Sequence, residues 1–263
     1  MSRWDDFAWT HYQVGFIAHD AACFLSWHRW FIALFESSLR TDCGYSGPMP
    51  YWDWTLDWEH PELASIFDDK FGLGGNGDKM HTSTADGAWC VESGPFAGAQ
   101  IPFDYSAVAG EEVFLNAQGQ NTSFCLSRKF ALGNSFDASQ LAPQHVSWVL
   151  SQRGYVKFLM ELEEGPHNTI PFGINGTFLT LYAPEDPIFF LHHMQLDRLW
   201  WSWQKSRPEN ARAYNGPSTS QTTAVAKLTD SLPFGNLSED VIVKDIIDTK
   251  RGRLCYEYDE VAA

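Results

Sequence analysis

The chain of 263 residues is long enough for one domain of about 150–250 residues with additional loops. Hydrophobic residues make up 44% and aromatic residues 15%, a composition that excludes a largely disordered chain. The formal net charge of −15 argues against binding to a nucleic acid backbone or to an anionic membrane surface. No apolar stretch approaches the roughly 18 residues that a transmembrane helix needs.

Four segments are predicted to be helical, because apolar residues recur in them with the α-helical period or because they contain few helix breakers. These are residues 4–20, 24–40, 145–164 and 187–204. Gly165-Pro166 is expected to end the third segment, and Pro187 suits the first turn of the fourth. The simplest architecture is therefore four helices joined by loops.

The remaining segments show little periodicity. Residues 55–140 are predicted to be long loops with short helices, because Gly, Asp, Ser and Asn are frequent there. The tail, residues 207–263, is polar, and only residues 241–247 and 253–258 in it suggest strands. The chain begins within a predicted helix and shows no apolar leader, so we expect a missing upstream segment and a single domain over residues 1–263.

The nine histidines are the strongest chemical signal. A lone histidine beside a helix is usually an ordinary core or surface residue, but His11, His19 and His28 fall within eighteen residues that are rich in Trp and Phe. His167 and the pair His192-His193 accompany the third and fourth predicted helices. Imidazole suits copper, zinc, iron or nickel, and a histidine-only donor set without a cysteine or paired carboxylates favours copper.

Several motifs together resemble one family. They are Phe24-Leu25-Ser26-Trp27-His28-Arg29, Pro50-Tyr51-Trp52-Asp53-Trp54, Gly165-Pro166-His167-Asn168, and Asp186-Pro187 through Trp200. In this order the chain resembles the tyrosinase and catechol oxidase family of type 3 copper proteins, most closely its short secreted fungal members. The resemblance implies a mainly α fold, a four-helix bundle that carries two copper ions and is surrounded by long loops and short strands.

The resemblance also implies three histidine ligands for each copper ion. His11, His19 and His28 match the first site, and His167 and His193 match two ligands of the second. The sixth ligand should stand four residues after His167, where this chain has Pro171. Three alternatives remain open: His192 or His145 takes the place, two imidazoles suffice for the second ion, or the protein holds one copper ion or none well. In the family His192 is a packing neighbour, and we interpret it, His60 and His81 as structural.

Further roles follow from the same resemblance. Glu163 stands four residues before His167 and is expected to hold a water that deprotonates the phenol, with Asn168 as the second partner of that water. The alternative for Glu163 is a solvated carboxylate in an acidic run. Phe178 is expected to overhang the site as a substrate gate, with plain core packing as its alternative. Asp197 is expected to orient an imidazole or to pair with an arginine such as Arg29.

The segments Pro50–Trp54 and Asp186-Pro187 are interpreted as scaffold and as a helix start, respectively. Some family members link a cysteine to the second histidine of the first site, but Ile17 stands at that position here, so no such bond is predicted. Cys23 is expected to be a buried thiol. No CxxC pair suggests a zinc knuckle.

Four cysteines are then left for two disulfides: Cys43, Cys90, Cys125 and Cys255. Three glycosylation triplets begin at Asn121, Asn175 and Asn236, and with the fungal resemblance they favour a secreted protein.

The implied activity is oxidation of o-diphenols (catechols) to o-quinones by dioxygen, with hydroxylation of monophenols as an open addition. The expected partners are a small phenolic substrate and dioxygen, without nucleic acid or membrane. Three alternatives remain: a reversible dioxygen carrier like the haemocyanins, a degenerate family member with an incomplete second copper site, and, more distantly, a zinc hydrolase.

Overall fold

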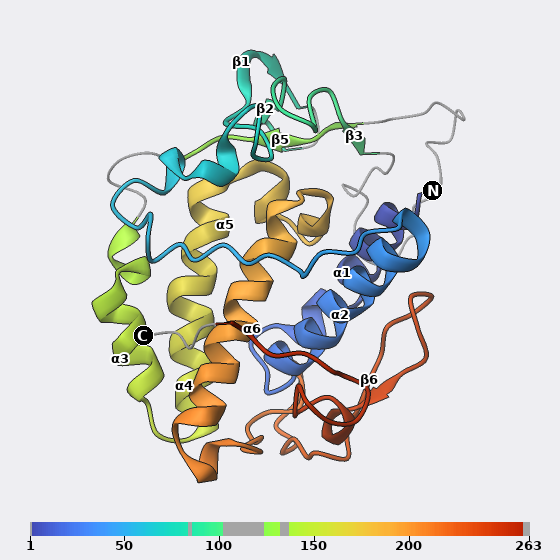
Figure 1. Ribbon diagram of the computed structural model, residues 1–263, viewed down its shortest axis with the longest axis vertical. Coiled ribbons are helices and arrows are strands. Elements are labelled where there is room, and N and C mark those ends of the chain that lie inside the picture. Colours follow the sequence, from blue (N-terminus) through green and yellow to red (C-terminus); the bar gives the residue numbers. More distant parts are fainter. Residues whose placement is uncertain (1, 84–85, 102–123, 132–136, 260–263) are drawn as a thin grey trace.

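The computed structural model describes the chain except for residues 1, 84–85, 102–123, 132–136 and 260–263 (Figure 1). The helices of the first half are α1 (Arg3–Ala18) and α2 (Phe24–Cys43), close to the predicted ranges. Helix α1 begins with a capping box in which Ser2 and Asp5 satisfy each other's backbone N–H groups. Four of the largest fully buried side chains are tryptophans, Trp27, Trp54, Trp200 and Trp203, so the aromatic content of the chain forms the core.

The third predicted helix is not continuous. It consists of α3 (Pro143–Ser151) and α4 (Tyr155–Leu162), separated at Gly154, whose φ of 82° lies in the left-handed region that glycine tolerates. The expected stop at Gly165-Pro166 is also wrong, because a π-helical segment η4 (Glu163–His167) and helix α5 (Asn168–Ile174) follow without a break. The wider π turn accommodates Pro166, which lacks the N–H of a regular α-helical bond.

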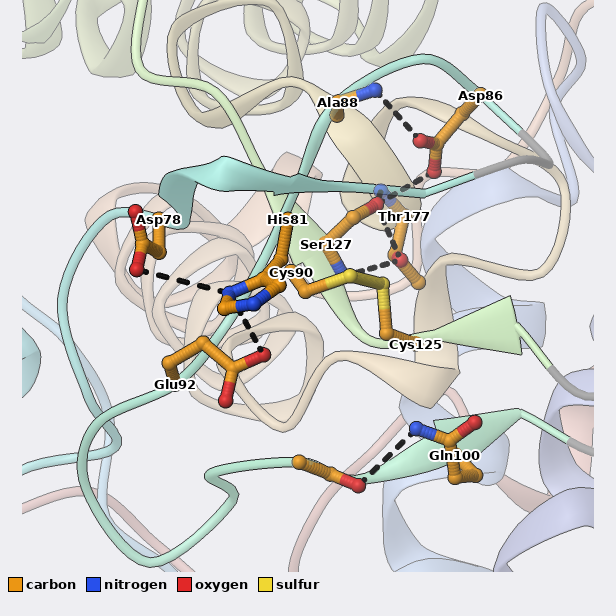
Figure 2. Close-up of a disulfide and its surroundings, with 11 residues drawn as sticks. Asp78, His81, Asp86, Ala88, Cys90, Glu92, Gln100, Cys125, Ser127 and Thr177 are labelled. Atoms are coloured by element: carbon orange, nitrogen blue, oxygen red, sulfur yellow. Dashed lines mark hydrogen bonds and ion pairs between the residues drawn. A yellow bond between two sulfur atoms is a disulfide. The ribbon is translucent and has the colours of Figure 1, made fainter.

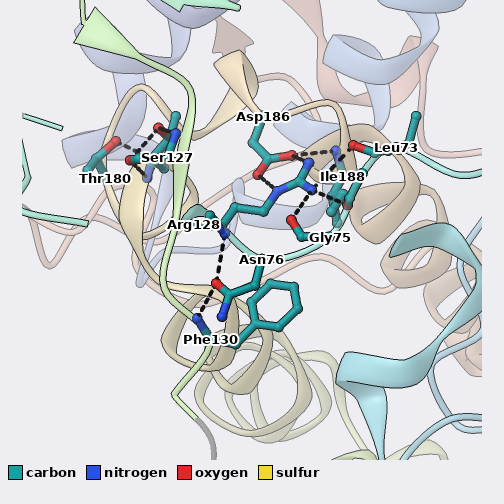
Figure 3. A network of polar contacts seen from close by, with 12 residues as sticks. Leu73, Gly75, Asn76, Ser127, Arg128, Phe130, Thr180, Asp186 and Ile188 are labelled. Carbon is teal, nitrogen blue, oxygen red and sulfur yellow. Dashed lines mark hydrogen bonds and ion pairs between the residues drawn. The ribbon is translucent and has the colours of Figure 1, made fainter. Parts of the chain in front are cut away.

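Helix α6 (Ile188–Ser206) runs through the middle of the molecule, as predicted from its apolar periodicity (Figure 1). Its start is fixed by Asp186, whose Oδ1 accepts a hydrogen bond from the backbone N–H of Ile188 at 3.0 Å. The same carboxylate forms a two-pronged ion pair with Arg128, and both side chains are fully buried (Figure 3). The expected helix start is confirmed, and the ion pair connects the start of α6 to Arg128 on strand β5 (Ser127–Arg128).

Residues 55–140 contain small sheets that the sequence did not indicate. The three-stranded sheet has the order β1 (Asp78–Thr82), β2 (Trp89–Cys90) and β5 (Ser127–Arg128), and β3 (Gln100–Ile101) pairs with β4 (Phe124–Cys125). All these pairings are antiparallel. Short 3₁₀ turns η1 (Pro61–Leu63) and η2 (Ser65–Phe67) precede them, in keeping with the short helices expected there.

A disulfide links Cys90 in β2 to Cys125 in β4 (Figure 2). The predicted second disulfide is wrong, because Cys43 and Cys255 are both exposed free thiols. A count of leftover cysteines does not reveal whether two Cα atoms come within the roughly 7 Å that a disulfide requires. Cys23 is a buried free thiol, as expected, and burial raises its pKa to about 12.

The tail contains less strand than predicted. Strands β6 (Ser231–Leu232) and β7 (Val241–Ile242) pair with each other, but a 3₁₀ turn η8 (Val243–Asp245) follows at once, and residues 253–258 form no strand. Instead the tail packs on the helices: Phe234 stacks on Trp27 with ring centroids 5.2 Å apart. In the described part of the chain no helix is both long and apolar enough to span a bilayer.

Asp197 of α6 joins the helices to the tail. Its Oδ1 accepts a bond from Arg29 Nε of α2 at 2.5 Å, and its Oδ2 accepts bonds from the hydroxyls of Tyr256 and Tyr258 at 2.5 and 2.6 Å. The guanidinium also lies over the ring of Trp200, 3.7 Å from its centroid. The expected pairing of Asp197 with Arg29 is confirmed, and the two tyrosines were not anticipated.

Candidate metal centre

The first histidine cluster is built from α1, its C-terminal end and α2. His11 Nδ1 lies 2.6 Å from the carbonyl oxygen of Leu181. His19 and His28 each place Nδ1 next to the carbonyl oxygen of the residue four positions earlier, at 2.9 and 2.8 Å. A carbonyl oxygen only accepts, so each Nδ1 carries the proton and each Nε2 keeps its lone pair for a metal.

These three side chains converge. Each offers one nitrogen, and the three nitrogens lie within 4.8 Å of one another. The ring centroids are 5.0 to 5.6 Å apart. A Cβ on Gly15 of α1 would lie 2.9 Å from Leu181 Cδ2, so a larger residue there would have to push aside the end of that side chain.

The second cluster unites His167 of η4 with His192 and His193 of α6, again with one nitrogen from each within 4.8 Å of the others. His167 Nδ1 lies 2.9 Å from the side-chain oxygen of Asn168, which orients this ring as the carbonyls orient the first three. Pro171 brings no donor atom. The sequence leaves His192 as either a packing neighbour or a ligand, and the structure places its ring inside the cluster.

The two clusters adjoin each other. The rings of His28 and His193 stack with centroids 4.2 Å apart, and those of His19 and His167 are 5.8 Å apart. Helices far apart in the sequence thereby bring six imidazoles to one place.

Burial keeps these imidazoles neutral. Desolvation lowers the pKa of His11 and of His167 to about 3 and depresses the pKa values of His28, His192 and His193 well below the usual value. Neutral imidazole is the form that binds a metal. The Nε2 atoms of His11 and His28, whose protons lie on Nδ1, are buried without a hydrogen-bond partner, as expected of atoms that bind a metal. The donor set therefore fits copper ions.

Glu163 contacts the turn that follows α1. Its Oε1 accepts a hydrogen bond from the backbone N–H of Asp20 at 2.8 Å, and Asp20 adopts a left-handed conformation with φ of 54°. This bond joins the turn after His19 to the π-helical segment that carries His167. Desolvation raises the Glu163 pKa to about 8. The alternative of a solvated surface carboxylate is wrong, because the residue is only 4% exposed.

A cavity of about 470 Å³ opens onto the histidines, and Asn168 and Phe178 are among the residues that line it. Phe178 is buried, and its ring lies 5.9 Å from that of His192. The rim carries three exposed apolar side chains that the sequence analysis missed, Phe16, Phe172 and Leu179. Their exposure could not be predicted from the sequence, because a hydrophobic pattern assigns every apolar residue to the core.

Three other histidines lie outside the clusters. His60 and His81 are largely exposed, and His81 lies on strand β1 rather than in a loop, beside Asp78 and Glu92 (Figure 2). His145 lies on α3, with its ring 5.3 Å from that of Trp148. It belongs to neither cluster and does not line the cavity.

Fold and site together define a helical metalloprotein with paired three-histidine clusters at the base of a cavity. The sequence model of a protein family, described as the common central domain of tyrosinase, matches residues 1–206. The chain is 38% identical over 260 residues to tyrosinase ustQ of Aspergillus flavus, covering 97% of this chain and 69% of that protein. It is 39% identical over 271 residues to the tyrosinase-like protein phomQ1 of Diaporthe leptostromiformis, covering 97% and 68%.

A solved structure shares the fold. A polyphenol oxidase (mutant G292N) from Thermothelomyces thermophila matches with a TM-score of 0.78 at 28% identity, over 98% of this chain and 78% of that one. The chain belongs to the tyrosinase family. It is therefore a copper-type oxidoreductase whose expected reaction partners are a small phenol and dioxygen.

Proposed function

We propose that this protein is a polyphenol oxidase that converts o-diphenols to o-quinones with dioxygen. Two copper ions would be held by His11, His19 and His28 on one side and by a site that includes His167 and His193 on the other. Copper, when bound, supplies the electron exchange between the phenol and dioxygen. The observation that carries the proposal is the pair of adjoining clusters of neutral imidazoles that face one cavity.

The protein itself has to orient the ligands and handle a proton. Carbonyl oxygens and the Asn168 side chain fix the tautomer of four histidine rings, with the proton on Nδ1. Metal binding at Nε2 therefore requires no movement of this proton. In our proposal Glu163 accepts, through a water, the proton that the phenol must lose. Positive charge on bound copper lowers the pKa of this buried carboxyl and favours its ionised form.

Asn168 was expected to be a second partner of that water. Its side-chain oxygen is already engaged by His167 Nδ1, so only its amide group remains to contact a water in the cavity. We therefore assign Asn168 mainly to positioning His167. An amide that orients a metal ligand affects metal affinity as well as turnover.

The residues that line the cavity support a proposal for the substrate class. Among the described residues that line it, the charged side chain other than histidine is Asp20, and no lysine or arginine faces a substrate carboxylate. Apolar side chains, including Phe178 and Phe189, form much of the wall. We infer neutral or amine-bearing phenols rather than phenolic acids.

We also propose a secreted protein. The Cys90–Cys125 disulfide is typical of proteins from oxidising compartments, and Asn236, in one glycosylation triplet, is exposed. The triplet at Asn175 is packed, since Thr177 is fully buried and bonded to Ser127. The triplet at Asn121 lies outside the described residues.

Oxygen uptake with catechol tests the proposal. Copper-loaded wild-type protein should consume dioxygen and form an o-quinone, and His28→Ala should abolish both while leaving the helical circular dichroism unchanged. His81→Ala, on the exposed strand β1, is the matched control and should retain wild-type activity. Reversible dioxygen binding without quinone formation would instead indicate a carrier. Full activity of His28→Ala would refute the assignment.

A further inference from the structure

The second metal site lacks a histidine at the position where the family motif would supply one. Pro171 stands one helical turn after His167 on α5 and lines the same cavity. Its ring nitrogen is part of the peptide bond and has no lone pair for a metal. If the second copper ion has a full set of imidazole ligands, one of them comes from another element of the fold.

We propose that His192 is this sixth ligand and that it binds through Nε2, an inference that rests on the proposed function. Its ring centroid lies 5.4 Å from that of His167 and 5.3 Å from that of His193. Nε2 of His192 is buried and has no hydrogen-bond partner. A buried polar atom without a partner destabilises the fold, and coordination to a metal removes that cost.

His145, the other candidate from the sequence, does not meet these conditions. It lies on α3, packs against Trp148 and contributes to neither histidine cluster. Its Nε2 is also buried without a partner, but a Cβ added to Gly165 would lie 3.3 Å from this atom. The atom therefore faces the backbone beside Pro166 and not the cavity.

Trp54 makes His192 different from the other ligands. Its indole N–H, which can only donate, lies 3.3 Å from His192 Nδ1. Nδ1 therefore accepts, and the proton of the neutral ring resides on Nε2. To bind a metal through Nε2 as a neutral ring, His192 must move this proton to Nδ1, and the Trp54 N–H then loses its acceptor. The four rings whose Nδ1 already carries the proton need no such change, so the second copper ion should be held more weakly than the first.

Copper content separates these possibilities. His192→Asn keeps an oxygen near the Nδ1 position for Trp54 but lacks the Nε2 nitrogen. We expect two copper ions per chain in the wild type and one in His192→Asn, by elemental analysis after copper saturation and desalting. An EPR spin count should change in parallel, from a coupled pair to a lone Cu(II). Titration of the wild type with a chelator should remove the two ions in separate steps.

Two further variants complete the test. His145→Ala is the matched control and should keep two ions. Pro171→His in the His192→Asn background restores the motif ligand on α5, so it should raise the copper content back towards two and show that the loss was not misfolding. Two tightly held ions in His192→Asn would overturn the inference but leave the dicopper proposal intact. One copper ion or none in the wild type would overturn the dicopper proposal together with the inference.

Discussion

The substitution Asp197→Asn should destabilise the protein more than any surface charge change. Asp197 is 2% exposed and accepts bonds from Arg29, Tyr256 and Tyr258 at 2.5 to 2.6 Å. Removing one partner of a buried ion pair costs about 3–5 kcal/mol, because the remaining charge stays uncompensated. The guanidinium of Arg29 keeps its bonds to Gln204 and to a backbone carbonyl, so we expect a loss within that range rather than above it.

Urea unfolding followed by tryptophan fluorescence measures this loss. With a urea m value of about 3 kcal/mol/M, the midpoint should fall by about 1–1.7 M. Glu36→Gln on the same helix as Arg29 is the control: it breaks an exposed pair with Arg40 and should change the free energy of unfolding by less than about 0.5 kcal/mol. Equal midpoints for Asp197→Asn and Glu36→Gln would refute the view that this network ties the tail to the helices.

Three other outcomes follow from the site. Glu163→Gln keeps an oxygen for the Asp20 N–H but removes the base, so turnover should fall about 10²-fold with copper content unchanged; a wild-type rate would exclude Glu163 from proton transfer. Phe178→Ala should raise the rate with 4-tert-butylcatechol relative to catechol, and an unchanged ratio would mean that Phe178 is only core packing. Metal-free protein should lose stability as the pH falls below 6.5, because the unfolded chain protonates His11 and His167 there while the native rings stay neutral to about pH 3. Each ring contributes up to about 1.4 kcal/mol per pH unit to that slope, and flat stability between pH 6.5 and 4 would contradict it.

Sequence reasoning located the long helices well, because their periodicity reports which face is buried. It failed where one residue overrides the pattern. Gly154 breaks a segment that is apolar on both sides, and the π turn carries the chain through Pro166, which usually ends a helix. Strands of two residues, such as β2 and β5, are too short to leave a period in the sequence.

The part of the candidate site that lies in recognisable sequence motifs could be predicted. Five histidines and Glu163 were identified from spacing and family resemblance, and the structure brings these histidines together. The role of His192 depends on which way its ring points on α6, and the rim formed by Phe16 and Phe172 depends on exposure; neither is written in residue spacing. The hydroxyls that meet at Asp197 come from a tail whose path no local pattern specifies.

The copper content of the wild-type protein tests the central claim most directly. After saturation with copper and removal of loosely bound metal, elemental analysis should find two ions per chain, and His28→Ala should lower this number by disrupting the first cluster. A wild-type chain that retains no copper, or that retains as much in His28→Ala as in the wild type, would contradict the assignment of these histidines to a dinuclear copper centre.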